Sequence, residues 1–212
     1  MIEYWKRNIL NCWNIFSRNY ILLITPCILS LIMLFYVSVS INDTPMPMPK
    51  IILMISLSLI SIGVHIGSIS VTYRAIIGEK ITFKDIFKQF DKLHLILIPN
   101  IGLFAILFIL VTNFSISSYL LILITGALYF SFLYFYDYLI IIEKLTIKEA
   151  IMKNYYLVSN NLALVLQFVL ISFLIGFCLS IFQIIGSVLA MCFIRIIGIN
   201  LFLAISKSIK VE

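Results

Sequence analysis

The sequence predicts an all-α fold with six membrane-spanning helices and three amphipathic helices on the cytoplasmic surface. Of the 212 residues, 63% are hydrophobic and 11% are charged, whereas a soluble domain is nearer half apolar and a quarter charged. The apolar residues gather in runs long enough to cross a bilayer, which takes about 20 residues. Short charged segments with a helical apolar stripe precede alternate runs. The whole chain, 1–212, is therefore expected to form one integral membrane domain.

The clearest charged segments are two versions of one pattern, which begin at Glu79 and at Glu143. Each has a threonine followed three residues later by an acid, as in a helix capping box. Both segments are too short to cross a bilayer, so each is predicted to form a helix on the membrane surface, over about 82–92 and 146–158. In the first, the apolar stripe is Phe83, Ile86, Phe87 and Phe90, and the wet face includes Lys84, Asp85 and Lys88.

A weaker third version occupies the start of the chain, from Met1 to Asn19. Its apolar residues recur at helical spacing, with Lys and Arg on the remaining surface. The predicted stripe is Ile2, Trp5, Ile9, Trp13 and Phe16. Aromatic side chains on one face and basic ones on the other suit a helix that lies in the headgroup plane.

The six predicted spans cover about 20–41, 51–73, 93–112, 119–142, 162–182 and 184–206. Pro26 is expected to kink the first. In the second, Gly63-x-x-x-Gly67 predicts a face for close helix packing. Residues 162–194 contain no charge and are too many for one span, so we divide them near 183–187. The result is a threefold repeat of surface helix, span and span, with units of about 1–73, 74–142 and 143–212.

The basic residues predict the orientation in the cell membrane. Of the 15 Lys and Arg residues, all but Lys50 and Arg195 precede or follow the spans on one side. By the positive-inside rule this side is cytoplasmic, as are both termini. The net charge of +6 then faces anionic headgroups, and nucleic acid is not an expected partner.

Arg195 is the strongest candidate for a functional residue, because it lies in the sixth span, where a lone charge is costly. It is expected either to bind an anionic group or to be satisfied by structural partners. Arg74 and Asp137 are expected to pair near the cytoplasmic surface, with a proton relay as the alternative. His65, beside the Gly63/Gly67 face, is a weaker ligand candidate.

No metal site, cofactor or catalytic centre is predicted. The four cysteines are scattered through apolar stretches and are expected to act as small hydrophobes: Cys12, Cys27, Cys178 and Cys192. Nucleophile-elbow, phosphate-loop and zinc-protease motifs are missing from the sequence.

The stretch from Glu143 to Asn161, EKLTIKEAIMKNYYLVSNN, leads directly into a predicted span. It resembles the linker before span five in a broad prokaryotic family of six-span membrane proteins of unknown function. That family includes the membrane domain attached to some glycerophosphodiester phosphodiesterases, as well as stand-alone archaeal and bacterial proteins. The resemblance implies six spans and supplies no catalytic residues, and the 212 residues hold no phosphodiesterase domain.

Two functions follow as expectations. The first is a non-enzymatic membrane protein that binds or organises lipid, or that assists a membrane partner. The alternative is a small secondary transporter or channel with a site near Arg195. The expected partners are membrane lipids, with a second membrane protein or another copy of the chain as further options.

Overall fold

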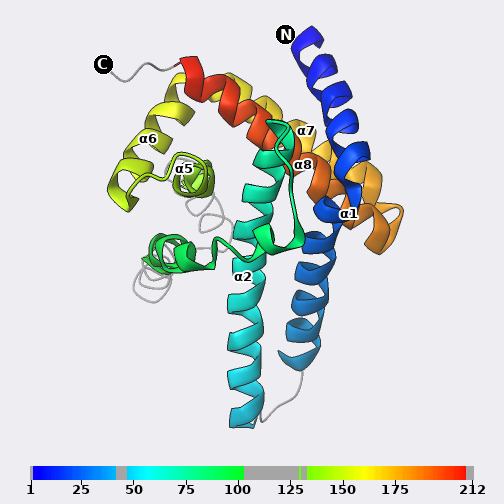
Figure 1. The fold of residues 1–212 in the computed structure, drawn as a ribbon, viewed down its shortest axis with the longest axis vertical. Coiled ribbons are helices and arrows are strands. Elements are labelled where there is room, and N and C mark those ends of the chain that lie inside the picture. Colours follow the sequence, from blue (N-terminus) through cyan, green and yellow to red (C-terminus); the bar gives the residue numbers. More distant parts are fainter. Residues whose placement is uncertain (1, 42–46, 103–128, 130–132, 209–212) are drawn as a thin grey trace, which may run out of the picture. The chain divides into compact units, whose positions relative to one another are not determined.

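The computed structural model describes residues 2–41, 47–102, 129 and 133–208, which form helices joined by turns and contain no strands (Figure 1). This confirms the all-α class. The elements are α1 (Ile2–Ile41), α2 (Met48–Ile76), the 3-10 helices η1 (Phe83–Ile86) and η2 (Phe90–Lys92), α5 (Tyr136–Ile141), α6 (Ile147–Asn160), α7 (Leu162–Ser180) and α8 (Gln183–Ser208). They form two compact units: a first unit of Met1–Phe90 and Phe168–Leu201, and a second of Asp91–Gln167 and Phe202–Glu212.

Four helices in the described part of the chain are long and apolar enough to span a membrane. The segments are Glu3–Met33, Met48–Ile76, Leu162–Leu179 and Gln183–Lys207. Such helices are expected of an integral membrane protein. About half of each predicted span at 93–112 and 119–142 lies outside the described residues, so the total of six spans and the threefold repeat stay predictions.

Helix α1 joins the first predicted surface helix to the first predicted span. The helix breaks at Asn19 (φ −130°, ψ 17°), where the surface helix is predicted to end. The Asn19 amide donates to the Ile15 carbonyl at 3.1 Å and so competes with the backbone ladder. Pro26 also lies inside α1, within helical backbone, and the kink expected there stays a prediction.

The N-terminal part of α1, up to the break at Asn19, packs against protein on one face, and its position on the membrane surface stays a prediction. Its buried face packs on α8, where the rings of Trp13 and Phe16 lie 6.3 and 5.1 Å from the ring of Phe193. Cys12 and Ile15 are buried as well, whereas Ile9 from the predicted stripe is half exposed. Helix α8 of the same chain therefore contacts some of the apolar side chains that were predicted to face the headgroup plane.

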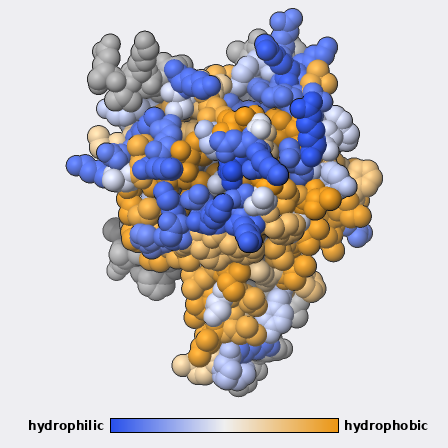
Figure 2. Space-filling model, viewed as in Figure 1, coloured by the Kyte–Doolittle hydropathy of each residue, from blue (hydrophilic) through white to orange (hydrophobic). Residues whose placement is uncertain are grey.

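The two halves of helix α2 differ in burial: the first is apolar and exposed, and the second packs against protein. Its first half exposes large apolar side chains, and its second half, from Ser61 to Ala75, contains nearly all of its buried residues. The joined ends of α1 and α2 carry a largely apolar surface in Figure 2. The exposed apolar residues there include Ile28, Ile32, Phe35, Ile51, Ile52, Leu53, Ile55, Leu59 and Ile60.

The Gly63/Gly67 face is a packing face, as predicted, but its partner is the segment that follows α2. A Cβ atom on Gly67 would lie 1.7 Å from the carbonyl oxygen of Ile86, and one on Gly63 would lie 2.5 Å from the Phe90 ring. Residues 83–90 thus fold back against α2, as the green chain beside that helix shows in Figure 1. Only glycine permits this approach of two backbones.

The predicted α-helix over 82–92 is instead two 3-10 turns, η1 and η2. Its capping contact is present, because the Asp85 carboxylate accepts bonds from the N–H and hydroxyl of Thr82 at 2.7 and 2.8 Å. Asp85 was predicted on the wet face but is buried, since contact of the adjacent Ile86 with Gly67 draws the turn inward. The guanidinium of Arg74 (2.8 Å) and the ammonium of Lys88 (2.6 Å) compensate its charge.

These contacts make the Asp85 turn sensitive to pH. Lys88, then Thr82 and Arg74, hold the pKa of the Asp85 carboxyl well below its ordinary value. A carboxyl whose pKa is lowered by folding stabilises the fold above its unfolded pKa of about 3.9. That contribution is lost as the pH falls through the folded pKa.

The second capping box is confirmed at the start of α6. The Glu149 carboxylate accepts from the N–H and hydroxyl of Thr146, and the Glu149 N–H donates to the Thr146 hydroxyl at 3.4 Å. These bonds lower the pKa of the Glu149 carboxyl. Helix α6 then buries one face through Ala150, Leu157 and Val158.

The division of the long uncharged run is confirmed to within about two residues. Helix α7 ends at Ser180 and α8 begins at Gln183, so two residues link them in a helical hairpin. The turn needs glycine at position 186, because a Cβ there would lie 1.7 Å from the Leu179 carbonyl oxygen.

We expect Gly67→Ala and Gly186→Ala each to destabilise the protein by about 1–3 kcal/mol, the usual cost of overpacking. Both added methyl groups collide with a backbone carbonyl, which cannot swing away as a flexible side chain can. The measurement is thermal unfolding in detergent, followed by tryptophan fluorescence. Gly176→Ala is the matched control in α7, where an added Cβ meets nothing within 4 Å. Equal melting temperatures for all three variants would contradict the packing described above.

Candidate functional site

Arg195 lies at the centre of the apolar segment Gln183–Lys207 in α8. Its side chain is half-buried. An isolated charge at such a position costs at least a few kcal/mol, so it has to find polar partners or a bound anion. The surroundings of this guanidinium therefore form a candidate functional site.

The structure brings two of the predicted site residues together. The Nη2 atom of Arg195 lies 3.4 Å from Nδ1 of His65, although 130 positions separate them in the chain. Nη1 of Arg195 donates to the sulfur of Cys27 at 3.5 Å. Three helices of the first unit, α1, α2 and α8, thus meet at one charged side chain.

The partners of Arg195 are neutral or titratable groups, not carboxylates. Ion pairs among the described residues involve Arg74, Lys88 and Lys153, and none of them includes Arg195. A thiol and an imidazole orient the guanidinium. His65 is itself exposed, so the cluster can be reached from outside the helices.

Two cysteines complete the cluster, and the sequence did not predict this. The sulfurs of Cys27 and Cys192 are 3.5 Å apart, and both thiols donate to the carbonyl of Leu23, at 3.5 and 3.3 Å. Both cysteines are buried. They lie 165 positions apart in different spans, so no local spacing signals the pair.

The other two predicted site residues lie elsewhere. Arg74 bonds Glu79 at 2.7 Å and Asp85 at 2.8 Å, which gives it a structural role at the end of α2. Asp137 belongs to α5 in the second unit. Its pairing with Arg74 stays a prediction.

A polar cluster in the second unit has a structural explanation. The Glu143 carboxylate accepts from the ammonium of Lys153 at 2.5 Å and from the hydroxyl of Ser206. Nearby, the side-chain oxygen of Asn154 accepts from the backbone N–H of Phe135 at 2.6 Å. These bonds tie α6 to the segment before it and to the end of α8. Nothing about them indicates a ligand.

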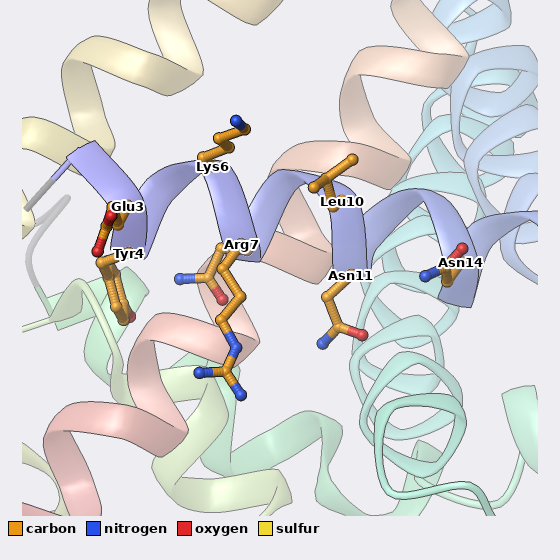
Figure 3. Close-up of a pocket in the computed structure, with 8 residues that line it drawn as sticks. Glu3, Tyr4, Lys6, Arg7, Leu10, Asn11 and Asn14 are labelled. Carbon is orange, nitrogen blue, oxygen red and sulfur yellow. The ribbon is translucent and has the colours of Figure 1, made fainter.

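A polar hollow of about 770 Å³ runs along the N-terminal part of α1. It is lined by Glu3, Tyr4, Lys6, Arg7, Asn8, Leu10, Asn11 and Asn14. Lys6 and Leu10 point to one side of the helix in Figure 3, and Tyr4, Arg7 and Asn11 point to the other. In the described part of the chain, neither the Tyr4 hydroxyl nor the Asn8 amide nitrogen has a hydrogen-bond partner.

No group of three His, Cys, Asp or Glu side chains within the described ranges is placed to hold a metal ion. The chemistry that the Arg195 cluster offers is therefore that of a cation and a hydrogen-bonding imidazole beside a pair of thiols. Such groups suit binding of a phosphate or a carboxylate.

We expect mild oxidation with copper phenanthroline to link Cys27 to Cys192. Each thiol loses a proton and an electron, oxygen accepts the electrons, and the sulfurs need to approach by about 1.5 Å to reach bonding distance. Mass spectrometry of peptides after alkylation of the remaining thiols detects the link. Cys27→Ser has to abolish it. A link from Cys192 to another cysteine in the wild type would contradict the packing of α1 on α8.

Comparison with known proteins gives no match: no family model matches the chain, and neither curated proteins nor solved structures show a significant similarity. The resemblance of residues 143–161 to a family of six-span proteins thus stays a prediction. The case for a function comes from the geometry of the helices and from the charge they enclose.

Proposed function

We propose that this integral membrane protein binds an anionic membrane lipid without catalysis, and that Arg195 and His65 hold the lipid phosphate. The observation that supports the proposal is the central position of Arg195 in α8, next to an exposed imidazole and without a carboxylate partner among the described residues. The anions of a membrane are chiefly lipid phosphates in the headgroup region, so this lipid binds with its phosphate drawn inward to the depth of Arg195.

The hydrogen bonds of the cluster suit this role. When Nδ1 of His65 accepts from Arg195, the proton of a neutral imidazole lies on Nε2, which becomes a donor. The N–H groups of the Arg195 guanidinium that do not contact His65 or Cys27 are the donors for the anion. Arginine binds phosphate through a planar fork, and such charge-assisted bonds are about twice as strong as neutral ones.

Arg195→Gln is expected to reduce the occupancy of the anionic phospholipid that binds at Arg195 at least tenfold in the purified protein. The expectation follows from about 1.5–3 kcal/mol for a lost hydrogen bond to a charged group. Native mass spectrometry of protein released from its own membranes measures the retained lipid. Lys207→Gln is the matched control, since it removes the same charge from the end of the same helix.

The alternative is a small transporter or channel whose substrate anion binds at the same two residues. Flux of small anions into liposomes separates the two functions. Flux that Arg195→Ala abolishes, together with lipid retention that Arg195→Gln leaves unchanged, would replace lipid binding with transport. A retained second protein instead of a lipid would make this chain an accessory subunit.

We also propose that both termini are cytoplasmic and that the segments around Lys84 and Lys148 face the inner leaflet, on the basis of the Lys and Arg distribution. A chain without native cysteines then receives a single one, Asp43→Cys or Lys148→Cys. An impermeant maleimide is expected to label the first in intact cells and the second only after lysis. Labelling of both positions from the same side would overturn the topology.

A further inference from the structure

A second feature of the first unit points to a ligand, independently of Arg195. An apolar groove of about 410 Å³ runs between α1, α7 and α8. Trp13 of α1, Cys178 of α7 and Phe193 of α8 line three sides of it. Trp13 and Cys178 are exposed, so the groove is open.

The groove and the polar hollow meet on α1. Lys6 lines the hollow, and Ile9 and Trp13 line the groove. Residues spaced by three and seven positions lie on one face of a helix, so Lys6 is in line with the groove and one turn beyond Ile9. In Figure 3 the Lys6 side chain points away from Arg7 and Asn11, which lie on the other side of the helix.

We propose that the groove and the hollow together bind one phospholipid with an anionic headgroup. Its acyl chain lies along the groove, and its phosphate lies at Lys6. Three observations support this occupant: the groove is apolar, it opens on helices apolar enough to span a membrane, and a cation lies in line with it at the border of a polar hollow. An amphipathic ligand fits both the apolar groove and the polar hollow. A polar solute fits only the hollow, and a wholly apolar one fits only the groove.

This lipid site is separate from the Arg195 cluster. Phe193 and Ile197, which line the groove, are each two positions from Arg195, and residues two apart point to nearly opposite sides of a helix. The inference thus extends the proposed lipid binding by a second site, and either site can fail without the other.

Trp13 provides a direct probe of the groove. With Trp5→Phe, Trp13 is the one remaining tryptophan, and bromine atoms on a lipid acyl chain quench it only on contact. The variant is reconstituted in vesicles of zwitterionic lipid that contain a small fraction of brominated phosphatidylglycerol or, in parallel, brominated phosphatidylcholine. We expect a preference for the anionic lipid of about fivefold in relative binding constant, the usual effect of one lysine at an anionic surface.

Two further variants localise the ligand. Lys6→Gln is expected to remove the fivefold preference, while Arg18→Gln, which removes an exposed charge from the same helix, leaves it in place. Cys178→Phe fills the groove and is expected to reduce quenching by both brominated lipids. Equal quenching by the two lipids in the Trp5→Phe protein, or a preference that survives Lys6→Gln, would show only general contact with the bilayer and overturn the proposal.

The measurement is repeated with Arg195→Gln to keep the two sites apart. Persistence of the Lys6-dependent preference in that variant is expected, because the groove is on the other side of α8. Loss of the preference with Arg195→Gln alone would mean that a single site at Arg195 accounts for lipid binding, and it would overturn the second site. Preserved preference together with unchanged lipid retention in Arg195→Gln would instead contradict only the Arg195 site.

Discussion

A guanidinium at the centre of an apolar helix has to be satisfied by neighbouring helices, and the first unit is arranged around that need. Cys27 of α1 and His65 of α2 both contact Arg195 of α8. The rings of Trp13 and Phe16 extend the contact between α1 and α8 through Phe193. In lipid there is little hydrophobic force between helices, so polar contacts and close packing carry more of the association.

The first unit is also packed through close contacts between helix glycines and the backbone of neighbouring turns. Gly67 admits the carbonyl of Ile86, and Gly186 admits the carbonyl of Leu179, so two turns fold tightly onto the helices next to them. The first of these contacts explains why Asp85 is buried and why Arg74 is needed beside it. Arg74 at the end of α2 thus compensates the Asp85 carboxylate, which is buried because Gly67, two turns earlier in α2, has no side chain.

The features that sequence alone predicted are local. Both capping boxes, the end of the first segment at Asn19 and the division of the uncharged run depend on residues within a few positions of one another. The features it missed depend on tertiary contact. Asp85 is buried because of Gly67, the 82–92 segment is compressed into 3-10 turns against α2, and Cys27 meets Cys192 across 165 positions. Arg195 could be singled out as a candidate from the sequence because a charged residue in an apolar run stands out without knowledge of its contacts.

The nature of its partners is the strongest reason to assign Arg195 a function. A charge retained only for structure is best met by a carboxylate, as the carboxylate of Asp85 meets Arg74 in the same unit. Arg195 instead contacts a thiol and an imidazole, which orient it. The cost of a charge at this depth in a membrane is offset when an anion binds. An arrangement that would be a defect in a purely structural helix is the one that the proposed phosphate site requires.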